Sequence, residues 1–124
     1  MIRILIVDDE RLARAELRRL LDVHADVDIV GEADNAATAL ELVTAHAPDA
    51  VFLDIQMPET TGLALAAELA GRTRFVFCSA YDSYAVDAFG LNAVDYLVKP
   101  VVPERLADTL ERLRQQGPAQ ALLP

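Results

Sequence analysis

The stretch ILIVDDE, residues 4–10, joins an apolar run to an acidic turn and indicates how the chain is built. The apolar run extends from Ile2 to Val7, which fits a strand covered on both faces of a sheet. Asp8 and Asp9 follow it directly. An amphipathic helix is predicted next, because apolar residues recur at i, i+4, i+7 and i+8, namely Ala13, Leu17, Leu20 and Leu21.

The same succession of strand and helix recurs along the chain. Further strands are predicted at Val27–Val30, Ala50–Leu53, Phe75–Cys78 and Val94–Val98. A helix is predicted after each of these strands. The first is capped by Asp34 or Asn35 and has the apolar stripe Ala36, Leu40, Val43 and Ala47. The others are predicted over Leu63–Leu69, from Asp82 through Phe89, and from near Pro103 onward. Apolar strands separated by helices indicate βαβ units and a parallel sheet covered on both faces.

Composition limits the possible functions. The chain has 124 residues, a length typical of one domain, and its net charge of −9 argues against a surface for a nucleic-acid backbone. Cys78 is alone, so no disulfide is predicted, and with His24 and His46 it makes no zinc pattern. The apolar opening is too short for a signal sequence or a membrane span. We therefore expect a cytoplasmic domain that binds cations or other proteins.

Polar residues end most of the predicted strands. Parallel strands point the same way, and ligands of such sheets bind in the crevice outside their carboxyl ends. Four of the five runs end there in reactive groups, namely Asp8 and Asp9, Asp54, Ser79 and Lys99, whereas the second run, ending at Gly31, has none. Lys99 is the only lysine in the chain. We expect these side chains to meet in one crevice.

This set of groups suits phosphoryl chemistry. Carboxylates that lie close together repel one another unless a cation holds them, and oxygen ligands at an open site favour Mg²⁺. Lys99 supplies a compact positive charge, and the hydroxyl of Ser79 can donate to an anionic oxygen. An aspartate in such a site can be the nucleophile that forms an aspartyl-phosphate. Each residue alone has a structural alternative, such as a helix cap, a turn hydroxyl or a solvated strand end.

In these motifs the sequence resembles the receiver domain of two-component response regulators, over residues 2 to about 115. The matching motifs are ILIVDDE (4–10), FLDIQMP (52–58), SA (79–80) and DYLVKP (95–100). The block 79–100 is most similar to receivers of LytTR-type transcriptional regulators. The resemblance implies a receiver domain over residues 1–116, a linker or tail over 117–124, and a C-terminal DNA-binding domain in a longer protein. A stand-alone receiver is the alternative.

The resemblance also implies a fold and a mechanism. The fold is a flavodoxin-like (βα)5 doubly wound parallel sheet in the order 2-1-3-4-5. Asp54 is the implied acceptor of a phosphoryl group from a sensor histidine kinase. The implied Mg²⁺ ligands are Asp9, Asp54, the carbonyl of Gln56, and Asp8 through water. Lys99 and Ser79 would bind phosphoryl oxygens.

The switch implied by the resemblance lies near the fifth strand. Tyr96 would turn inward behind Ser79, and the Lys99–Pro100 peptide bond would be cis. The face formed by the short helix, the fifth strand and the last helix would then control dimerisation and transcription. Such a domain is regulatory and is not an enzyme in its own right. It would contact DNA only through the C-terminal domain, and it would not bind a membrane.

Three other classes of protein fit the sequence less well. A phosphatase of the haloacid dehalogenase type needs a second Asp where the chain has Gln56, and a cap domain. A flavin or dinucleotide binder needs a phosphate loop where the chain has Asp8-Asp9-Glu10. A receiver-shaped module that is not phosphorylated keeps the fold but usually lacks one of the acids or the lysine. The arginines of the first helix, Arg11, Arg14, Arg18 and Arg19, are interpreted as a solvated face with a Glu10–Arg14 pair, or alternatively as a kinase-docking surface.

Overall fold

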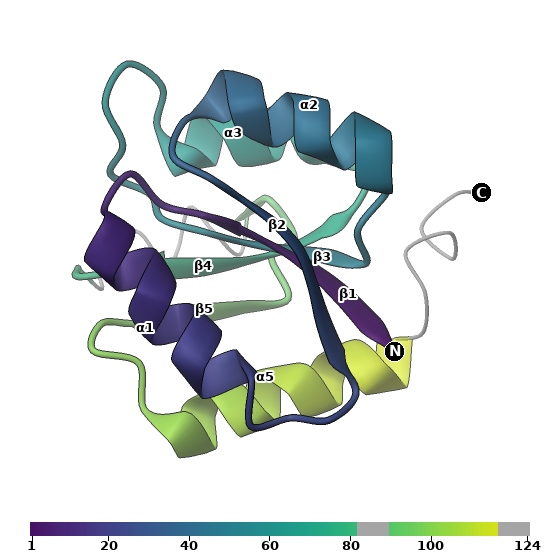
Figure 1. Ribbon diagram of the computed structural model, residues 1–124. Helices are drawn as coiled ribbons and strands as arrows, with labels where there is room; N and C mark the ends of the chain where they lie inside the picture. Colours follow the sequence, from purple (N-terminus) through teal and green to yellow (C-terminus); the bar gives the residue numbers. More distant parts are fainter. Residues whose placement is uncertain (82–89, 117–124) are drawn as a thin grey trace.

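The computed structural model describes residues 1–81 and 90–116, which form a parallel sheet between two layers of helices (Figure 1). The five strands are ordered β2-β1-β3-β4-β5, and they are β1 (Ile2–Val7), β2 (Val27–Ala33), β3 (Ala50–Leu53), β4 (Arg74–Ser79) and β5 (Asp95–Val98). The helices of the described residues are α1 (Arg11–Leu21), α2 (Ala36–His46), α3 (Gly62–Leu69) and α5 (Pro103–Gln116). The predicted fold class and strand order are confirmed. The predicted short helix at 82–89 and the tail at 117–124 lie outside the described residues.

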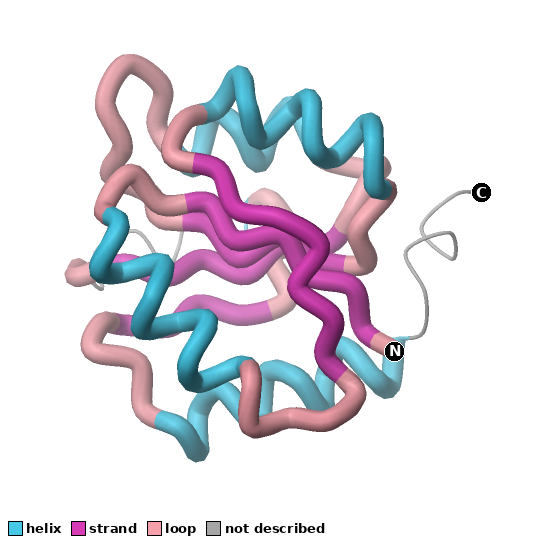
Figure 2. The backbone as a smooth tube through the Cα atoms, in the orientation of Figure 1, coloured by secondary structure: helices cyan, strands magenta, loops and turns pink. Residues whose placement is uncertain are grey.

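Alternate side chains of each strand enter different cores. Leu5 and Val7 of β1 pack with α2 and α3, whereas Ile4 and Ile6 pack with α1 and α5. Figures 1 and 2 show these helix pairs on opposite faces of the sheet. Because both faces are covered, the strands have to be apolar throughout, which is the pattern seen in the sequence.

Helix α2 begins at a polar cap, but its buried residues differ from the predicted stripe. Asn35 caps α2 by accepting the amide of Thr38 at 2.8 Å. The prediction for α2 was partly wrong, because Ala39 is buried with Val43, while Ala47 lies past the helix in a left-handed conformation. The small side chain of Ala39 lets the helix approach the sheet closely. Across 1–81 and 90–116, no helix is both long and apolar enough to span a bilayer.

Strand β2 is longer than predicted. It runs to Ala33, beyond the predicted end at Val30, and Asp34 follows it. The pairing with β1 shifts register here, since Ile4 is opposite Ile29 while Leu5 is opposite Gly31. This irregularity and the charged Glu32 interrupt the apolar pattern, so that pattern did not predict the last part of the strand.

Strand β5 is fixed to α5 by a buried carboxylate. Asp95 accepts hydrogen bonds from the Thr109 hydroxyl at 2.7 Å, from Arg105 at 3.1 Å and from the amide of Tyr96 at 2.8 Å. Arg112 lies 3.3 Å from the same carboxylate. Burial disfavours the charged form, but the hydrogen bonds of Thr109, Arg105 and the Tyr96 amide outweigh it and lower the pKa of Asp95. This cluster sets the position of the strand that leads into Lys99.

Candidate functional site

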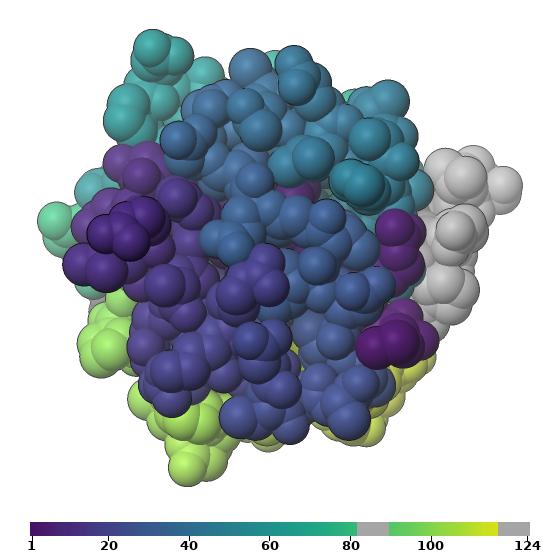
Figure 3. Space-filling view, in the orientation of Figure 1, coloured from purple at the N-terminus to yellow at the C-terminus, as the bar shows by residue number. Residues whose placement is uncertain are grey.

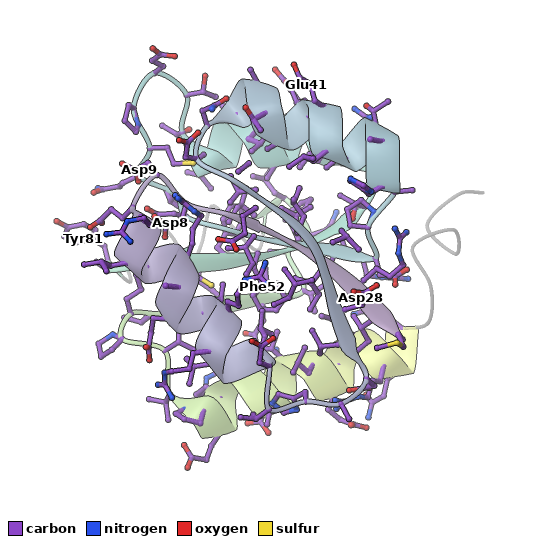
Figure 4. All side chains as sticks on the ribbon, viewed as in Figure 1. Asp8, Asp9, Asp28, Glu41, Phe52 and Tyr81 are labelled. Atoms are coloured by element: carbon purple, nitrogen blue, oxygen red, sulfur yellow. The ribbon has the colours of Figure 1, made fainter. Side chains whose placement is uncertain are left out.

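The carboxyl ends of β1, β3, β4 and β5 bring the predicted polar residues together. A cavity of about 240 Å³ at this edge is lined by Asp9, Glu10, Asp54, Gln56, Ser79, Ala80, Tyr81 and Lys99. Figure 4 shows Asp8, Asp9 and Tyr81 at the same end of the sheet, with Asp28 toward the other end. The structure thus brings together Asp9, Asp54, Ser79 and Lys99, as expected from the strand ends, with Gln56 beside them. The sequence did not single out Glu10.

Lys99 links two of the carboxylates. Its Nζ lies 2.7 Å from Oδ2 of Asp8, in a hydrogen-bonded ion pair, and 3.7 Å from Oδ2 of Asp54. The lysine side chain is 23% exposed, and both acids are buried. Burial disfavours the ammonium, but the hydrogen bond and charge of Asp8, with the charge of Asp54, outweigh it and raise the pKa of Lys99. The lysine is therefore a fixed positive charge in the crevice, and it lies between the carboxylates of Asp8 and Asp54.

Asp54 is held in a buried position directly after β3. The residue is 6% exposed, and its Oδ1 accepts the amide of Gln56 at 3.4 Å. Burial raises the pKa of Asp54, the charge of Lys99 opposes this rise, and the charges of Asp8 and Asp9 add to it. Because burial penalises the charged form of this carboxylate, a cation bound beside it would stabilise that form.

The raised pKa of Asp54 predicts a stabilising substitution. Between the unfolded and folded pKa values the folded protein binds more protons than the unfolded chain, so stability falls as pH rises through this window and stays reduced above it. Asp54→Asn is therefore expected to raise the free energy of unfolding at pH 7 in EDTA. The gain should shrink as the pH falls toward about 4, the ordinary pKa of an aspartate, because Asp54 then becomes increasingly protonated in both states. Urea unfolding of both proteins from pH 4 to 8 measures this. A gain that does not change with pH would contradict the ionisation argument.

The acidic turn offers ligands for a metal ion. Within the described ranges, Asp8, Asp9 and Glu10 place carboxylate oxygens within 4.8 Å of one another. Asp54 and Gln56 line the same cavity as Asp9 and Glu10. All of these donors are oxygens, which fits a hard divalent cation such as Mg²⁺ and does not fit the sulfur and nitrogen sites that zinc prefers.

Ser79 and Tyr96 meet at the backbone of Tyr81. The buried hydroxyl of Ser79 accepts the amide of Tyr81 at 3.1 Å, and the hydroxyl of Tyr96 donates to the carbonyl of Tyr81. Tyr96 is 7% exposed, and its ring centroid is 6.4 Å from that of Phe77. The tyrosine side chain is therefore packed in the core. The Lys99–Pro100 peptide bond beside it is cis.

Gly62 supports the loop after Asp54 and was not identified from sequence. Its amide donates to the carbonyl of Ile55 at 2.7 Å. A Cβ on Gly62 would lie 2.1 Å from the carbonyl oxygen of Asp54 and 2.9 Å from the Cα of Ile55. Only glycine therefore fits where α3 begins. The sequence signal was weak, because a glycine before a helix has many possible causes.

Residues 4–111 match the family model of the response regulator receiver domain. The chain belongs to this family. Receiver domains are regulatory, and this membership decides against the phosphatase and the dinucleotide binder. The five-stranded sheet and the acidic crevice of this receiver domain agree with the assignment.

Several known proteins are similar to this receiver domain. The transcriptional regulatory protein BtsR of Salmonella typhi is 49% identical over 100% of this chain and 54% of its own length. An uncharacterized response regulatory protein of Vibrio vulnificus is 47% identical over 98% of this chain and 51% of its own length. The response regulatory domain of protein mrkE from Klebsiella pneumoniae is 35% identical, with a TM-score of 0.84 over 92% of this chain and 96% of that domain. The chain thus spans about half the length of the curated relatives it matches.

Proposed function

We propose that this receiver domain accepts a phosphoryl group on Asp54 from a sensor histidine kinase in the cytoplasm, with Mg²⁺ as cofactor. The observation that carries the proposal is the buried Asp54 carboxylate in a cavity that it shares with Asp9, Ser79 and Lys99. Transfer of a phosphoryl group to an aspartate requires a nucleophile, acidic groups, a hydroxyl and a cationic side chain, and this cavity contains all of them.

In the proposed reaction an Oδ atom of Asp54 forms a bond to phosphorus while the bond between phosphorus and the donor nitrogen breaks, and the histidine leaves with the electron pair. Asp9, Asp54 and the carbonyl of Gln56, with Asp8 through water, would hold Mg²⁺, which would neutralise the charge of the phosphoryl group when bound. Glu10 is an additional ligand candidate from the acidic turn.

Other residues of the crevice bind and orient the product. Lys99 exchanges its contact with Asp54 for one with a phosphoryl oxygen, since its Nζ already lies 3.7 Å from the carboxylate. The hydroxyl of Ser79 turns to donate to another oxygen, which releases the amide of Tyr81 that it now accepts. The new charge is thereby transmitted to the backbone that Tyr96 contacts.

The proposed output is a change in the surface of β5 and α5. We propose that this change controls dimerisation, which brings together C-terminal DNA-binding domains of the LytTR type. Residues 1–116 are the proposed receiver unit and 117–124 the proposed linker. The description of BtsR as a transcriptional regulatory protein, and the roughly twofold greater length of both curated relatives, support an output domain in the longer protein.

The deciding experiment is intact mass spectrometry after incubation with acetyl phosphate and Mg²⁺. Wild type is expected to gain one phosphoryl group, and neither Asp54→Ala nor wild type in EDTA is expected to gain it. Analytical ultracentrifugation with beryllofluoride then tests dimerisation. If wild type gains no mass and does not bind beryllofluoride, the chain is a receiver-shaped interaction module that is not phosphorylated.

A further inference from the structure

An arginine outside the crevice holds the backbone of the acidic turn. Nη1 of Arg14, one turn into α1, donates to the carbonyl oxygen of Asp8 at 2.7 Å. The Arg14 side chain is only 17% exposed, so it is not part of the solvated face that the sequence suggested. The predicted pair with Glu10 is replaced by this contact and by one to strand β2.

Strand β2 fixes Arg14 from the other side. Nε of Arg14 lies 3.4 Å from Oε1 of Glu32, whose second oxygen accepts from Arg18 at 2.8 Å. The adjacent Ala33 accepts the amide of Asp8 at 3.0 Å. Helix α1 and strand β2 are in contact, and Figure 3 shows the segments from α1 to α2 as one continuous face. The end of β2 thus anchors the acidic turn both directly and through Arg14.

These contacts leave Asp8 little freedom. Its Oδ1 accepts the amide of Glu10 at 2.9 Å, and its Oδ2 accepts Lys99 at 2.7 Å. The side chain is therefore held at two atoms, and the backbone at the amide and the carbonyl. A shift of the carbonyl would move the Asp8 and Asp9 oxygens relative to one another.

We propose that Arg14, held by Glu32, is a positioning residue of the Mg²⁺ site, because it fixes the backbone from which the acidic ligands project. This inference rests on the proposed function, since it takes Mg²⁺ as the ion. Groups that orient metal ligands without contacting the metal typically contribute about 10–100-fold to metal affinity. We expect an effect near the lower limit, because Arg14 acts through a carbonyl.

A purely electrostatic role makes the opposite prediction. Arg14 carries a positive charge beside a cation site, so through-space repulsion alone would make its removal strengthen Mg²⁺ binding. If Arg14 positions the acidic ligands, its removal is expected to weaken Mg²⁺ binding. The direction of the change in Kd therefore separates the two roles.

The experiment is isothermal titration calorimetry with Mg²⁺ on four proteins: wild type, Arg14→Gln, Glu32→Gln and the double variant. Arg14→Gln is expected to raise Kd about tenfold. Glu32→Gln is expected to raise it by less, because glutamine can still accept a hydrogen bond from Arg14. If Glu32 acts through Arg14, adding Glu32→Gln to Arg14→Gln changes Kd no further.

Matched controls come from the same helix. Arg19 and Glu16 form an exposed ion pair at 2.6 Å, so Arg19→Gln and Glu16→Gln remove the same kinds of charge without touching the acidic turn. Both are expected to keep Kd within twofold of wild type. Thermal melting in EDTA checks that each variant is folded.

The proposal is overturned if Arg14→Gln leaves Kd unchanged or lowers it. If Arg14→Gln does not fold, Arg14→Lys decides, since it keeps the charge but cannot bridge Asp8 and Glu32 as a guanidinium does. A higher Kd for this variant supports positioning, and an unchanged Kd refutes it. Absence of Mg²⁺ binding by wild type would instead refute the proposed cofactor, which is a separate failure.

Discussion

Lys99→Met is expected to destabilise the Mg²⁺-free protein by roughly 2–3 kcal/mol at pH 7, because Asp8 and Asp54 lose their shared counter-charge. Removing one partner of a fully buried ion pair costs about 3–5 kcal/mol. The expected effect is smaller because the Lys99 side chain keeps 23% of its surface exposed. The same variant should accept a phosphoryl group from acetyl phosphate about 10²-fold more slowly, since a fixed charge that faces the transferring group is missing.

The measurement is urea unfolding with and without Mg²⁺, together with the rate of mass gain. Loss of the ammonium should raise the pKa of Asp54 further, so the stability of Lys99→Met should fall more steeply than that of wild type as pH rises from 4 to 7. Saturating Mg²⁺ should recover part of the lost stability by binding the folded state. Lys99→Arg is the control that keeps the charge. Equal stability of Lys99→Met and wild type across this range would refute the role assigned to the ion pair.

Gly62→Ala is expected to destabilise the protein by about 3 kcal/mol or more and to slow phosphorylation. The new Cβ would lie 2.1 Å from the carbonyl oxygen of Asp54 and 2.9 Å from its carbonyl carbon. Both atoms belong to the backbone, so no side-chain rotation relieves the clash, and overpacking of this kind costs about 1–3 kcal/mol even where neighbours adjust. The loop has to move, and the nucleophile moves with it.

Chemical denaturation and phosphorylation kinetics measure the two effects. Gly31→Ala is the matched control, because its Cβ would meet only side-chain carbons of Leu42 and Leu5, at 3.4 Å. That variant should stay close to wild type in stability and in rate. A Gly62→Ala protein with wild-type stability would show that α3 can retreat from Asp54, and a normal rate would show that the Asp54 loop tolerates the shift.

The sequence alone determined the parallel sheet and which polar residues lie at the carboxyl ends of its strands. The runs at Ile4–Val7 and Ala50–Leu53 contain no polar residue because both faces of the sheet are covered. In a parallel sheet the residues that follow such runs share one edge, so Asp54 and Lys99 could be placed together without coordinates. These features depend on local pattern and on one topological rule.

The structure differs from the predicted elements where the local sequence pattern does not determine which residues are buried. Strand β2 continues past an irregularity at Val30 because the backbone keeps pairing with β1, although Gly31 and Glu32 are not apolar. On α2, Ala39 is buried together with the predicted Val43, since the distance between helix and sheet decides which small residue is covered. Neither the distance between a helix and the sheet nor the pairing of two strands can be read from residue type.

Only the tertiary structure decided which partners the site residues take. Lys99 is closer to Asp8 than to Asp54, Arg14 bonds to the carbonyl of Asp8 instead of pairing with Glu10, and Gly62 lies against the backbone of Asp54. Each of these contacts joins different elements and depends on differences of about an ångström in register and helix placement. Sequence specifies which groups reach the edge of the sheet, because burial and strand direction are encoded locally. Which of those groups touch is decided by how the elements pack against one another, which residue type does not encode.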